Sequence, residues 1–298
     1  MARPALSGSR TIEIMNFLTA HVGQAFTLTE LAGALDINLA SAHAVLAAMT
    51  GAGYLNRHPV HKTYELGPLL IPIGRAAQAG NRVVDVARVE AKAFADECGF
   101  EGLVVGATSE ELVILERVGR PLPSRFVTTV GQRIRIVPPL AASFVAFADR
   151  AAIEDWLDRS PERGSRPLLE DILCETRRRG FSIGLDVTDR KQLRRALSEL
   201  QDAPGSKQAR STLDRTVAGL ARAETVLAKL EPRRKYRVAH LASPVFDEHA
   251  AVSVVIYVLG FTEALRGSEV AALGSQLRAV TQSVTRAVNG TWPRHTAS

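Results

Sequence analysis

Apolar side chains near the N-terminus recur every three or four residues in three successive runs, which predicts three helices. The first helix is expected over 9–22. The second begins after Thr27, which forms with Glu30 the sequence signature of a capping box. The third follows a polar break in which Asn38 can cap it, and it ends near Gly51. Two short helices joined by a tight turn are therefore expected within this stretch.

The pattern then changes to short strand-like runs. Tyr54–Arg57 and Lys62–Leu66 predict two strands around a turn that contains Pro59. Helix, turn, helix and β wing together make a winged helix-turn-helix, whose second helix is shaped to enter a DNA major groove. The alternative for the same pattern is a small helical subdomain that binds protein.

Beyond residue 68 the helical spacing continues through a connecting helix to Gly80 and a further run that ends near Gly99. The period then becomes two, and GLVVGAT and ELVILERV predict a hairpin turning at Ser109 and Glu110. Further strands are predicted at RFVTTV, FSIGLDV, YRVAHLASPVF and AAVSVVIYVLG, and further helices at 139–148, 150–159, 166–179 and 267–288. This order favours a curved antiparallel sheet with helices on its faces, able to form a pocket for a small molecule.

The segment 187–237 is polar and helical in pattern, with a break at Pro204–Ser206. It holds 13 Lys and Arg against 6 Asp and Glu, so its surplus of 7 exceeds the +6 of the whole chain. Leucine and valine positions predict a hairpin of two helices outside the sheet: Leu193, Leu197, Leu200, Leu213, Val217, Leu220 and Leu227.

Composition sets the class of protein. The 298 residues suffice for two domains, and 46% hydrophobic with 23% charged residues is typical of a soluble globular chain. Cys98 and Cys174 lack metal-ligand spacing, and no signal peptide or membrane-spanning run is seen, so a cytoplasmic protein is expected. The net charge favours an anionic partner. Residues 1–75 carry only 5 basic against 4 acidic residues, so one winged helix alone should bind DNA weakly.

Several strings resemble the IclR family of bacterial transcriptional regulators, over nearly the whole chain except the basic insertion. They are the opening SxxR at Ser7–Arg10, TLTELAGALDI, SAHAVLAAMTGAGYL, YELGP, LGPLLIPIGRAA, RRRGFSI and LASPVFDE. The resemblance implies an α+β fold: an N-terminal winged helix-turn-helix at 1–68, a linker helix at 69–80, and a GAF-like mixed α/β domain with a curved antiparallel sheet at 81–298. The basic insertion at about 187–237 lies within the last domain.

The same resemblance implies a homodimer or dimer of dimers that binds double-stranded DNA at a palindromic operator and is controlled by a small-molecule effector. No cofactor, metal or membrane partner is expected. His58 and His61 lie near each other in the wing without the carboxylates or thiols that would complete a metal site. An enzyme would need a convergent acid, base or nucleophile set, and the sequence offers none.

The expected DNA contacts are Arg10, Thr27, Asn38, Ser41, His43, Arg57 and Lys62. On the recognition helix, Ala40, Ser41, His43, Ala44 and Ala47 should face outward. Only the serine and the histidine can hydrogen-bond to bases there, while the alanines can touch thymine methyls. The recognition helix of the family carries a Ser-Thr-x-x-Arg type of pattern; here Ser41 matches it while the threonine and arginine positions do not, so an arginine-to-guanine contact from this helix is excluded.

The resemblance places the effector pocket at Ala141, Ala142, Ser143, Asp186, His240, Tyr257 and Leu259. Phe144 takes a position that is lysine in the family, and Tyr257 and Leu259 take positions of small polar groups, so the pocket is smaller and more apolar. Burying a carboxylate without enough donors is costly, and only His240 or Tyr257 offers one. An effector larger or more apolar than pyruvate is therefore expected. A ligand-independent regulator, or an interaction scaffold with an occluded pocket, is the alternative.

Overall fold

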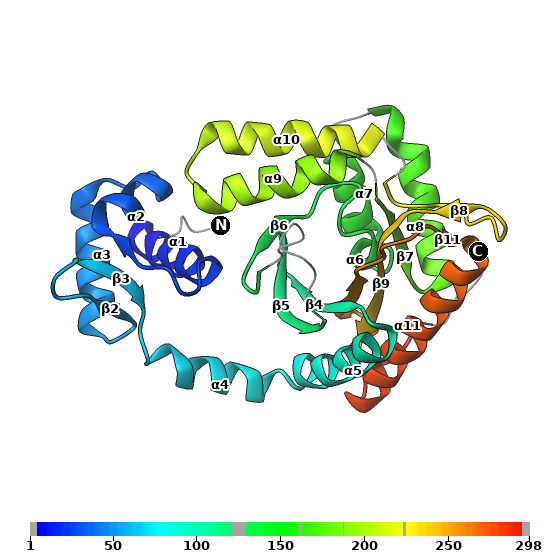
Figure 1. The fold of residues 1–298 in the computed structure, drawn as a ribbon, viewed down its shortest axis with the longest axis horizontal. Helices are drawn as coiled ribbons and strands as arrows, with labels where there is room; N and C mark the ends of the chain where they lie inside the picture. Colours follow the sequence, from blue (N-terminus) through cyan, green and yellow to red (C-terminus); the bar gives the residue numbers. More distant parts are fainter. Residues whose placement is uncertain (1–4, 121–128, 161–162, 187, 223–224, 294–298) are drawn as a thin grey trace. The chain divides into compact units, whose positions relative to one another are not determined.

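The computed structural model describes residues 5–293 except 121–128, 161–162, 187 and 223–224. Two compact units make up the chain (Figure 1). The first comprises Met1–Gly80 together with Arg194–Asp214, and the second comprises Asn81–Leu193 together with Arg215–Ser298. The first unit thus takes in part of the basic insertion, which the sequence places in the second domain.

The first unit contains the predicted winged helix-turn-helix. Its elements are α1 (Leu6–Ala20), β1 (Phe26–Thr27), α2 (Leu28–Leu35), α3 (Leu39–Gly51), β2 (Leu55–Arg57) and β3 (Thr63–Leu66). The strands form an antiparallel sheet in the order β1-β3-β2. Ile14, Leu31 and Leu46, one from each helix, are fully buried in a core of their own. The three helices and the wing are confirmed, with α1 starting three residues earlier than the spacing indicates.

A linker helix, α4 (Leu70–Gly80), follows the wing. It has no buried residue. Its apolar Ile71 and Ile73, together with Leu69 just before it, are about half exposed. A helix of 11 residues with no buried face is marginal by itself in water, so α4 has an apolar surface without a partner in the described chain.

The second unit is built on a six-stranded antiparallel sheet in the order β6-β5-β4-β10-β9-β7. The strands are β4 (Glu101–Ala107), β5 (Glu111–Gly119), β6 (Arg133–Arg135), β7 (Ser182–Leu185), β9 (Val238–Phe246) and β10 (Val252–Leu259). A small separate pair joins β8 (Lys235–Tyr236) to β11 (Leu265–Arg266). The helices are α5 (Arg82–Cys98), α6 (Ala142–Val145), α7 (Arg150–Asp158), the 3₁₀ turn η2 (Arg163–Ser165), α8 (Arg166–Arg179) and α11 (Gly267–Ala287).

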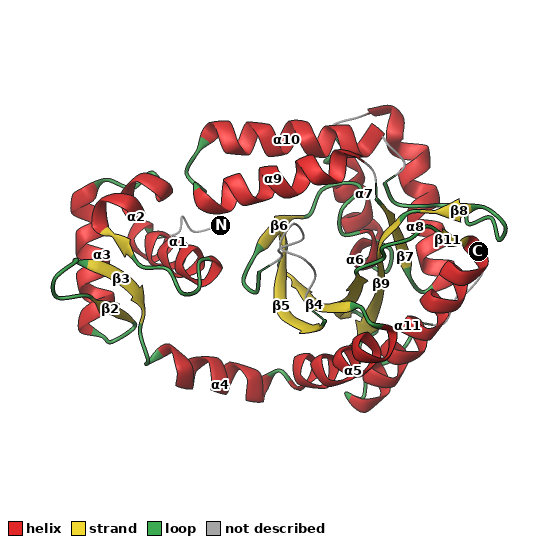
Figure 2. Ribbon diagram, in the orientation of Figure 1, coloured by secondary structure: helices red, strands yellow, loops and turns green. Residues whose placement is uncertain are grey.

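Helices cover both faces of this sheet (Figure 2). On one face, here called the α6–α8 face, Trp156 of α7 and Leu169 of α8 pack with Leu103 and Val255 of the sheet. The opposite face packs against α5 and α11 through a second apolar cluster. Because successive side chains along a strand point to opposite faces of the sheet, neighbouring residues pack in different cores. The mixed α/β architecture with an antiparallel sheet is confirmed.

Most predicted elements of this unit are present. The hairpin of β4 and β5 turns at Ser109 and Glu110, and α7, α8 and α11 match their predicted ranges closely. The helix expected over 139–148 is reduced to α6, because Pro138 and Pro139 precede it and Ala141 adopts a left-handed conformation with φ of 68°. The strand expected at RFVTTV falls mostly on 121–128, outside the described residues.

The insertion folds as the predicted pair of helices, α9 (Thr188–Asp202) and α10 (Lys207–Arg222), which run side by side in Figure 1. Pro204 and Gly205 lie in the turn between them. Leu197 and Leu213 are buried as their spacing indicates. The assignment of Leu227 to this hairpin is wrong: it lies beyond α10 and is buried in the cluster on the α5–α11 face of the sheet.

Candidate DNA-binding surface and effector site

The start of α2 is fixed by a reciprocal cap. The Thr27 hydroxyl accepts a hydrogen bond from the Glu30 backbone N–H at 3.3 Å, and the Thr27 N–H donates to the Glu30 carboxylate at 2.7 Å. The hydrogen bond from the Thr27 backbone lowers the pKa of Glu30 below its ordinary value, because it favours the charged carboxylate. The capping box is confirmed, and it fixes where the first helix of the DNA-binding motif begins.

The recognition helix α3 starts from a second cap. Asp36 ends α2 in a left-handed conformation, with φ of 55°, and two residues later the Asn38 side chain accepts from the Ser41 N–H at 2.9 Å. The side-chain oxygen of Asn38 therefore caps the helix, while its side-chain NH₂ group stays free to donate because the residue is exposed. This tight turn sets the direction of α3 relative to α2.

The outward face of α3 is small and nearly apolar. Ala40, His43, Ala44 and Ala47 are exposed and Ser41 is half-buried, as the helical spacing predicts. The opposite face buries Ala42, Leu46 and Met49. Among the outward side chains of the middle turns, His43 is the one with two ring nitrogens that can reach a base edge or a phosphate.

The wing presents exposed cations on an ordered turn. The Nδ1 atom of His58 accepts from the N–H groups of Val60 and His61, at 3.2 and 3.1 Å. Lys62 adopts φ of 57° and its Nζ donates to the Pro59 carbonyl at 2.5 Å. The two histidines and Lys62 therefore shape the turn, which is exposed to solvent as predicted.

Arg57 extends from the base of the same wing. Its guanidinium lies 5.6 Å from the ring centre of Tyr64, a cation–π distance that steadies the side chain while leaving it exposed. Arg10 lies in α1 and is half-buried. All seven predicted DNA-contacting residues lie in the winged-helix domain. Arg10 is in α1, Thr27 and Asn38 cap α2 and α3, Ser41 and His43 are in α3, and Arg57 and Lys62 are in the wing.

In the second unit, three of the predicted effector residues lie together on the α6–α8 face. Leu259 pairs with His240 across β9 and β10, and Tyr257 lies one step along the strand on the same side. The rings of His240 and Tyr257 meet edge to face, with centres 5.2 Å apart. All three side chains are half-buried, so part of each is accessible to solvent.

The other predicted effector residues are placed differently. Ala141, Ala142 and Ser143 are buried, and the Ser143 hydroxyl shares a 2.6 Å hydrogen bond with Ser182 and lies 3.3 Å from the Ala242 carbonyl. These groups tie α6 to the sheet. Asp186 follows β7, where its side chain is exposed and its N–H donates to the Arg237 carbonyl at 2.7 Å.

A buried ion pair that the sequence reasoning missed lies beside this cluster. Glu101 is only 1% exposed, lies opposite Leu259 on the α6–α8 face, and bonds to the Arg117 guanidinium. Its second carboxylate oxygen, Oε2, has no hydrogen-bond partner among the described residues. The signal in the sequence was a glutamate at the head of an apolar strand. The pair is neutral overall, so it adds no positive charge with which to bind an acid.

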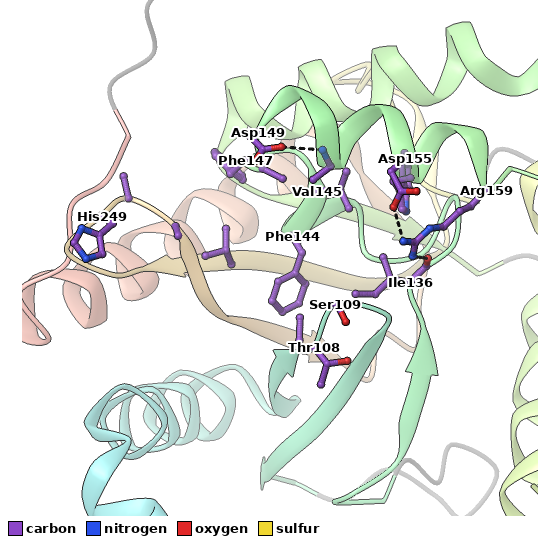
Figure 3. Close-up of a pocket in the computed structure, with 17 residues that line it drawn as sticks. Thr108, Ser109, Ile136, Phe144, Val145, Phe147, Asp149, Asp155, Arg159 and His249 are labelled. Atoms are coloured by element: carbon purple, nitrogen blue, oxygen red, sulfur yellow. Dashed lines mark hydrogen bonds and ion pairs between the residues drawn. The ribbon is translucent and has the colours of Figure 1, made fainter. Parts of the chain in front are cut away.

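A separate cleft of about 560 Å³ opens at the other end of the same face (Figure 3). It lies between the turn after β4, the start of β10, and helices α6 and α7. Phe144, Val145 and Ile136 form its apolar wall, and the polar Asp149 and Arg159 lie at its rim. Asp149 caps α7, and Arg159 pairs with Asp155 and donates to the Ile136 carbonyl. None of the seven predicted effector residues lines this cleft.

The described residues hold no group of three His, Cys, Asp or Glu side chains that could bind a metal ion. No single helix among them has the length and apolar character needed to cross a membrane. The bent pair of α2 and α3 reaches those limits only when both helices are counted together, by length and composition alone.

Comparisons with known proteins agree on one family. Residues 8–59 match the model of the IclR helix-turn-helix domain. The chain is 27% identical over 206 residues to the glycerol operon regulatory protein of Streptomyces griseus. The matched segment covers 63% of this chain and 76% of that protein.

Solved structures show the same fold over almost the full chain. An IclR transcriptional regulator from Alicyclobacillus acidocaldarius superposes with a TM-score of 0.68 at 19% identity, covering 97% of this chain and 100% of that one. An IclR homologue from Microbacterium hydrocarbonoxydans, solved with 4-hydroxybenzoate, gives 0.61 at 15% identity and covers 94% and 99%. These proteins are regulators rather than enzymes. With its winged helix-turn-helix and its helix-covered antiparallel sheet, the chain has the fold of these proteins, and its residues 8–59 match the helix-turn-helix domain of the IclR type.

Proposed function

We propose that the protein binds a palindromic operator through α3 and the wing, with His43 and Ser41 at the bases and Arg10, Arg57 and Lys62 at phosphates. One observation carries this proposal. The caps at Thr27 and Asn38 fix where α2 and α3 begin, and the outward face of α3 and the cations of the wing are both exposed. Thr27 and Asn38, at the N-termini of α2 and α3, are suited to hold backbone phosphates. A protein that acts on the bacterial chromosome does so in the cytoplasm.

The chain acts as a homodimer or a dimer of dimers. One winged helix carries a charge surplus of only 1 over residues 1–75, too little for tight DNA binding by itself. The half-exposed Leu69, Ile71 and Ile73 of the linker region give a second copy an apolar surface to cover. Two winged helices joined in this way read the two halves of a palindrome.

The effector binds on the α6–α8 face beside His240, Tyr257 and Leu259. The side chains are bulky and the neighbouring Glu101–Arg117 pair is neutral, which disfavours a three-carbon acid whose charge needs several donors. A larger, mostly apolar or phenolic ligand would place its polar end on His240 or Tyr257. The IclR homologue solved with 4-hydroxybenzoate supports an aromatic ligand of this size.

A regulator without an effector is the second candidate, and the burial of Ala141, Ala142 and Ser143 favours it. All three residues are buried, and Ser143 hydrogen-bonds to Ser182 and to the Ala242 carbonyl instead of being exposed to a ligand. Such a protein would be controlled by its own abundance. Asp186 remains exposed in either case and is assigned to the rim of the site.

DNA binding is tested by footprinting on the DNA that flanks the protein's own gene. We expect protection of a palindromic segment that weakens steeply as the salt concentration rises, because phosphate contacts release bound cations. No protection at low salt on any nearby promoter would overturn the regulator proposal.

Ligand binding is tested by thermal shift with pyruvate, glyoxylate, 4-hydroxybenzoate and more lipophilic metabolites. We expect stabilisation by an aromatic or lipophilic compound that is lost in His240→Ala, and no shift with the two small acids. Stabilisation by pyruvate that is lost in the same variant would refute the apolar pocket. No shift with any compound would favour the regulator without an effector.

A further inference from the structure

The end of α9 and the turn that follows it, Gln201–Ser206, lie against the winged helix within the first unit, and we call this segment the hairpin tip. The Gln201 side chain donates to the Ala20 carbonyl at 2.8 Å, which satisfies a carbonyl at the end of α1. The Asp202 carboxylate lies 3.2 Å from Nε2 of His21. His21 is 7% exposed and its other ring nitrogen lies 2.7 Å from the Phe17 carbonyl, so both ring nitrogens have oxygen partners.

The hairpin tip also contacts the turn between α2 and α3. The Gly205 N–H donates to the Ala34 carbonyl at 2.9 Å. A Cβ atom on Gly205 would lie 2.7 Å from the backbone carbon of Leu35 and 2.8 Å from the backbone nitrogen and the Cβ of Asp36. Backbone atoms cannot swing aside, so only glycine permits this approach. The contact is made at the residue whose left-handed conformation sets the direction of α3.

The other end of the hairpin is fixed in the second unit. After α10 the chain returns beside β7, where the Leu185 N–H donates to Thr225 at 2.8 Å and the Leu227 N–H donates to Ile183 at 2.9 Å. Thr225 and Leu227 are each 2% exposed. The returning segment therefore extends the edge of the sheet.

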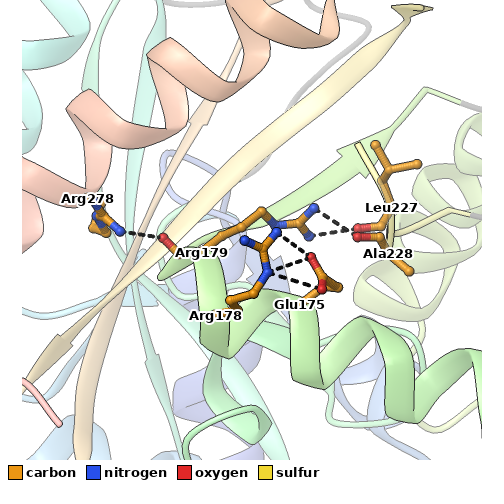
Figure 4. A network of polar contacts seen from close by, with 6 residues as sticks. All are labelled: Glu175, Arg178, Arg179, Leu227, Ala228 and Arg278. Atoms are coloured by element: carbon orange, nitrogen blue, oxygen red, sulfur yellow. Dashed lines mark hydrogen bonds and ion pairs between the residues drawn. The ribbon is translucent and has the colours of Figure 1, made fainter. Parts of the chain in front are cut away.

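Arg179 at the end of α8 holds the same returning segment (Figure 4). Its buried guanidinium donates to the carbonyls of Leu227 and Ala228 at 2.8 and 2.9 Å. Burial lowers the pKa of Arg179 to about 10, which still leaves it charged at neutral pH. The neighbouring Arg178 instead pairs with Glu175 at the surface.

The beginning of the hairpin adjoins the proposed effector site. Asp186 directly follows β7, and α9 begins two residues later at Thr188. Gly184 of the same strand lies opposite His240 in the sheet. A ligand that displaces the end of β7 would therefore displace the first turn of a helix whose far end carries Asp202.

We propose that the insertion is an intramolecular arm, and that a surface formed by the end of α1 and the α2–α3 turn is the docking site for its tip. In this proposal the linker helix α4 and the two arm helices, α9 and α10, both transmit a conformational change from one unit to the other. The docking itself stands without the proposed function, whereas its role in regulation rests on the proposal that α3 binds DNA.

The docked tip leaves the proposed DNA surface open. His43, Arg57 and Lys62 remain exposed while Gly205 and Asp202 are in contact with the domain. Docking therefore favours DNA binding by holding α3 in a single orientation, which lowers the ordering cost of the complex. Release of the tip should weaken operator binding.

Docking is tested by hydrogen exchange on the full chain, comparing wild type with Gly205→Val. The matched control is Gly33→Val, because a Cβ atom on Gly33 meets nothing within 4 Å. We expect faster exchange at 17–24 and 32–40 in Gly205→Val alone, with 55–66 unchanged as an internal reference. Equal exchange in wild type and Gly205→Val would overturn the docking.

A second pair of variants keeps the backbone of the tip intact. Asp202→Asn removes the charge facing His21, while Glu199→Gln makes the same change one turn earlier, where the partner is Arg195 of the same helix. Faster exchange at 17–24 in Asp202→Asn but not in Glu199→Gln supports the contact. Identical exchange in both would contradict it.

The regulatory role is tested by titrating the same four variants with the DNA upstream of the protein's own gene. We expect Gly205→Val to bind roughly fivefold more weakly, at the lower end of known allosteric couplings, with Gly33→Val unchanged. Unchanged or tighter binding by a variant whose exchange shows release would overturn the coupling. Failure of the wild type to bind any of this DNA would refute the proposed function and leave the docking result standing.

Discussion

The two units of the chain place their candidate functional residues in opposite ways. In the winged helix, His43, Arg57 and Lys62 are exposed on elements whose core lies on the other side. In the second unit, Ser143 of α6 is buried where it hydrogen-bonds to the sheet, and Glu101 of β4 is buried in an ion pair with Arg117.

This difference predicts how substitutions behave. An exposed side chain that acts on DNA can be removed at little cost in stability, because its few contacts within the protein are at the surface. A buried polar group cannot, because its partners lose their hydrogen bonds inside the protein. The winged helix should therefore show effects on binding, and the sheet unit should show effects on folding.

The largest effect on folding is expected at Arg179. Arg179→Ala leaves the buried carbonyls of Leu227 and Ala228 without a donor and should lower the free energy of unfolding by about 3 kcal/mol. Arg178→Ala, which loses only a surface pair with Glu175, should change it by less than about 0.5 kcal/mol. Urea denaturation measures both. Equal losses would show that the two arginines do not differ as their burial indicates.

A smaller loss is expected at Ser143. Ser143→Ala deprives Ser182 of its hydroxyl partner inside the protein and should cost about 2 kcal/mol in the free energy of unfolding. Ser109→Ala, at an exposed turn position, is the control. If Ser143→Ala left stability unchanged but altered a ligand-induced thermal shift, Ser143 would belong to an accessible pocket instead.

The winged helix should give the reverse result. His43→Ala should cost roughly 1–3 kcal/mol of binding to the operator and little on random DNA, with the unfolding transition unchanged. Arg57→Ala should weaken binding to every DNA sequence and lower the slope of the salt dependence by about one. Gel shifts across a salt series separate the two. Equal losses on both DNAs from His43→Ala would refute base reading by that side chain.

The smallest effect is expected at the first helix cap. Thr27→Ala removes the oxygen that accepts from Glu30 and should lower stability by about 1 kcal/mol. Thr29→Ala, at the exposed second position of the same helix, is the comparison. A loss of DNA binding in Thr27→Ala larger than its loss of stability would add a direct phosphate contact to the role of this residue.

The sequence by itself determined the elements whose signals are local. The capping box at Thr27, the cap at Asn38 and the outward face of α3 follow from residues three or four positions apart, so they could be read without knowing the fold. The alternation that predicted the strands, and the break that divides α9 from α10, are local signals too.

Only the tertiary structure decided which distant residues meet. The pairing of β9 with β7 and β10 places Ser143 against Ala242 and brings His240 to Tyr257, and no spacing along the chain specifies that register. Leu227 carried the same apolar signal as the hairpin leucines, yet it packs in the sheet. The contact of Gly205 with the α2–α3 turn joins residues about 170 positions apart. Such contacts depend on the shapes of whole packed elements, which the order of residues determines only through the complete fold.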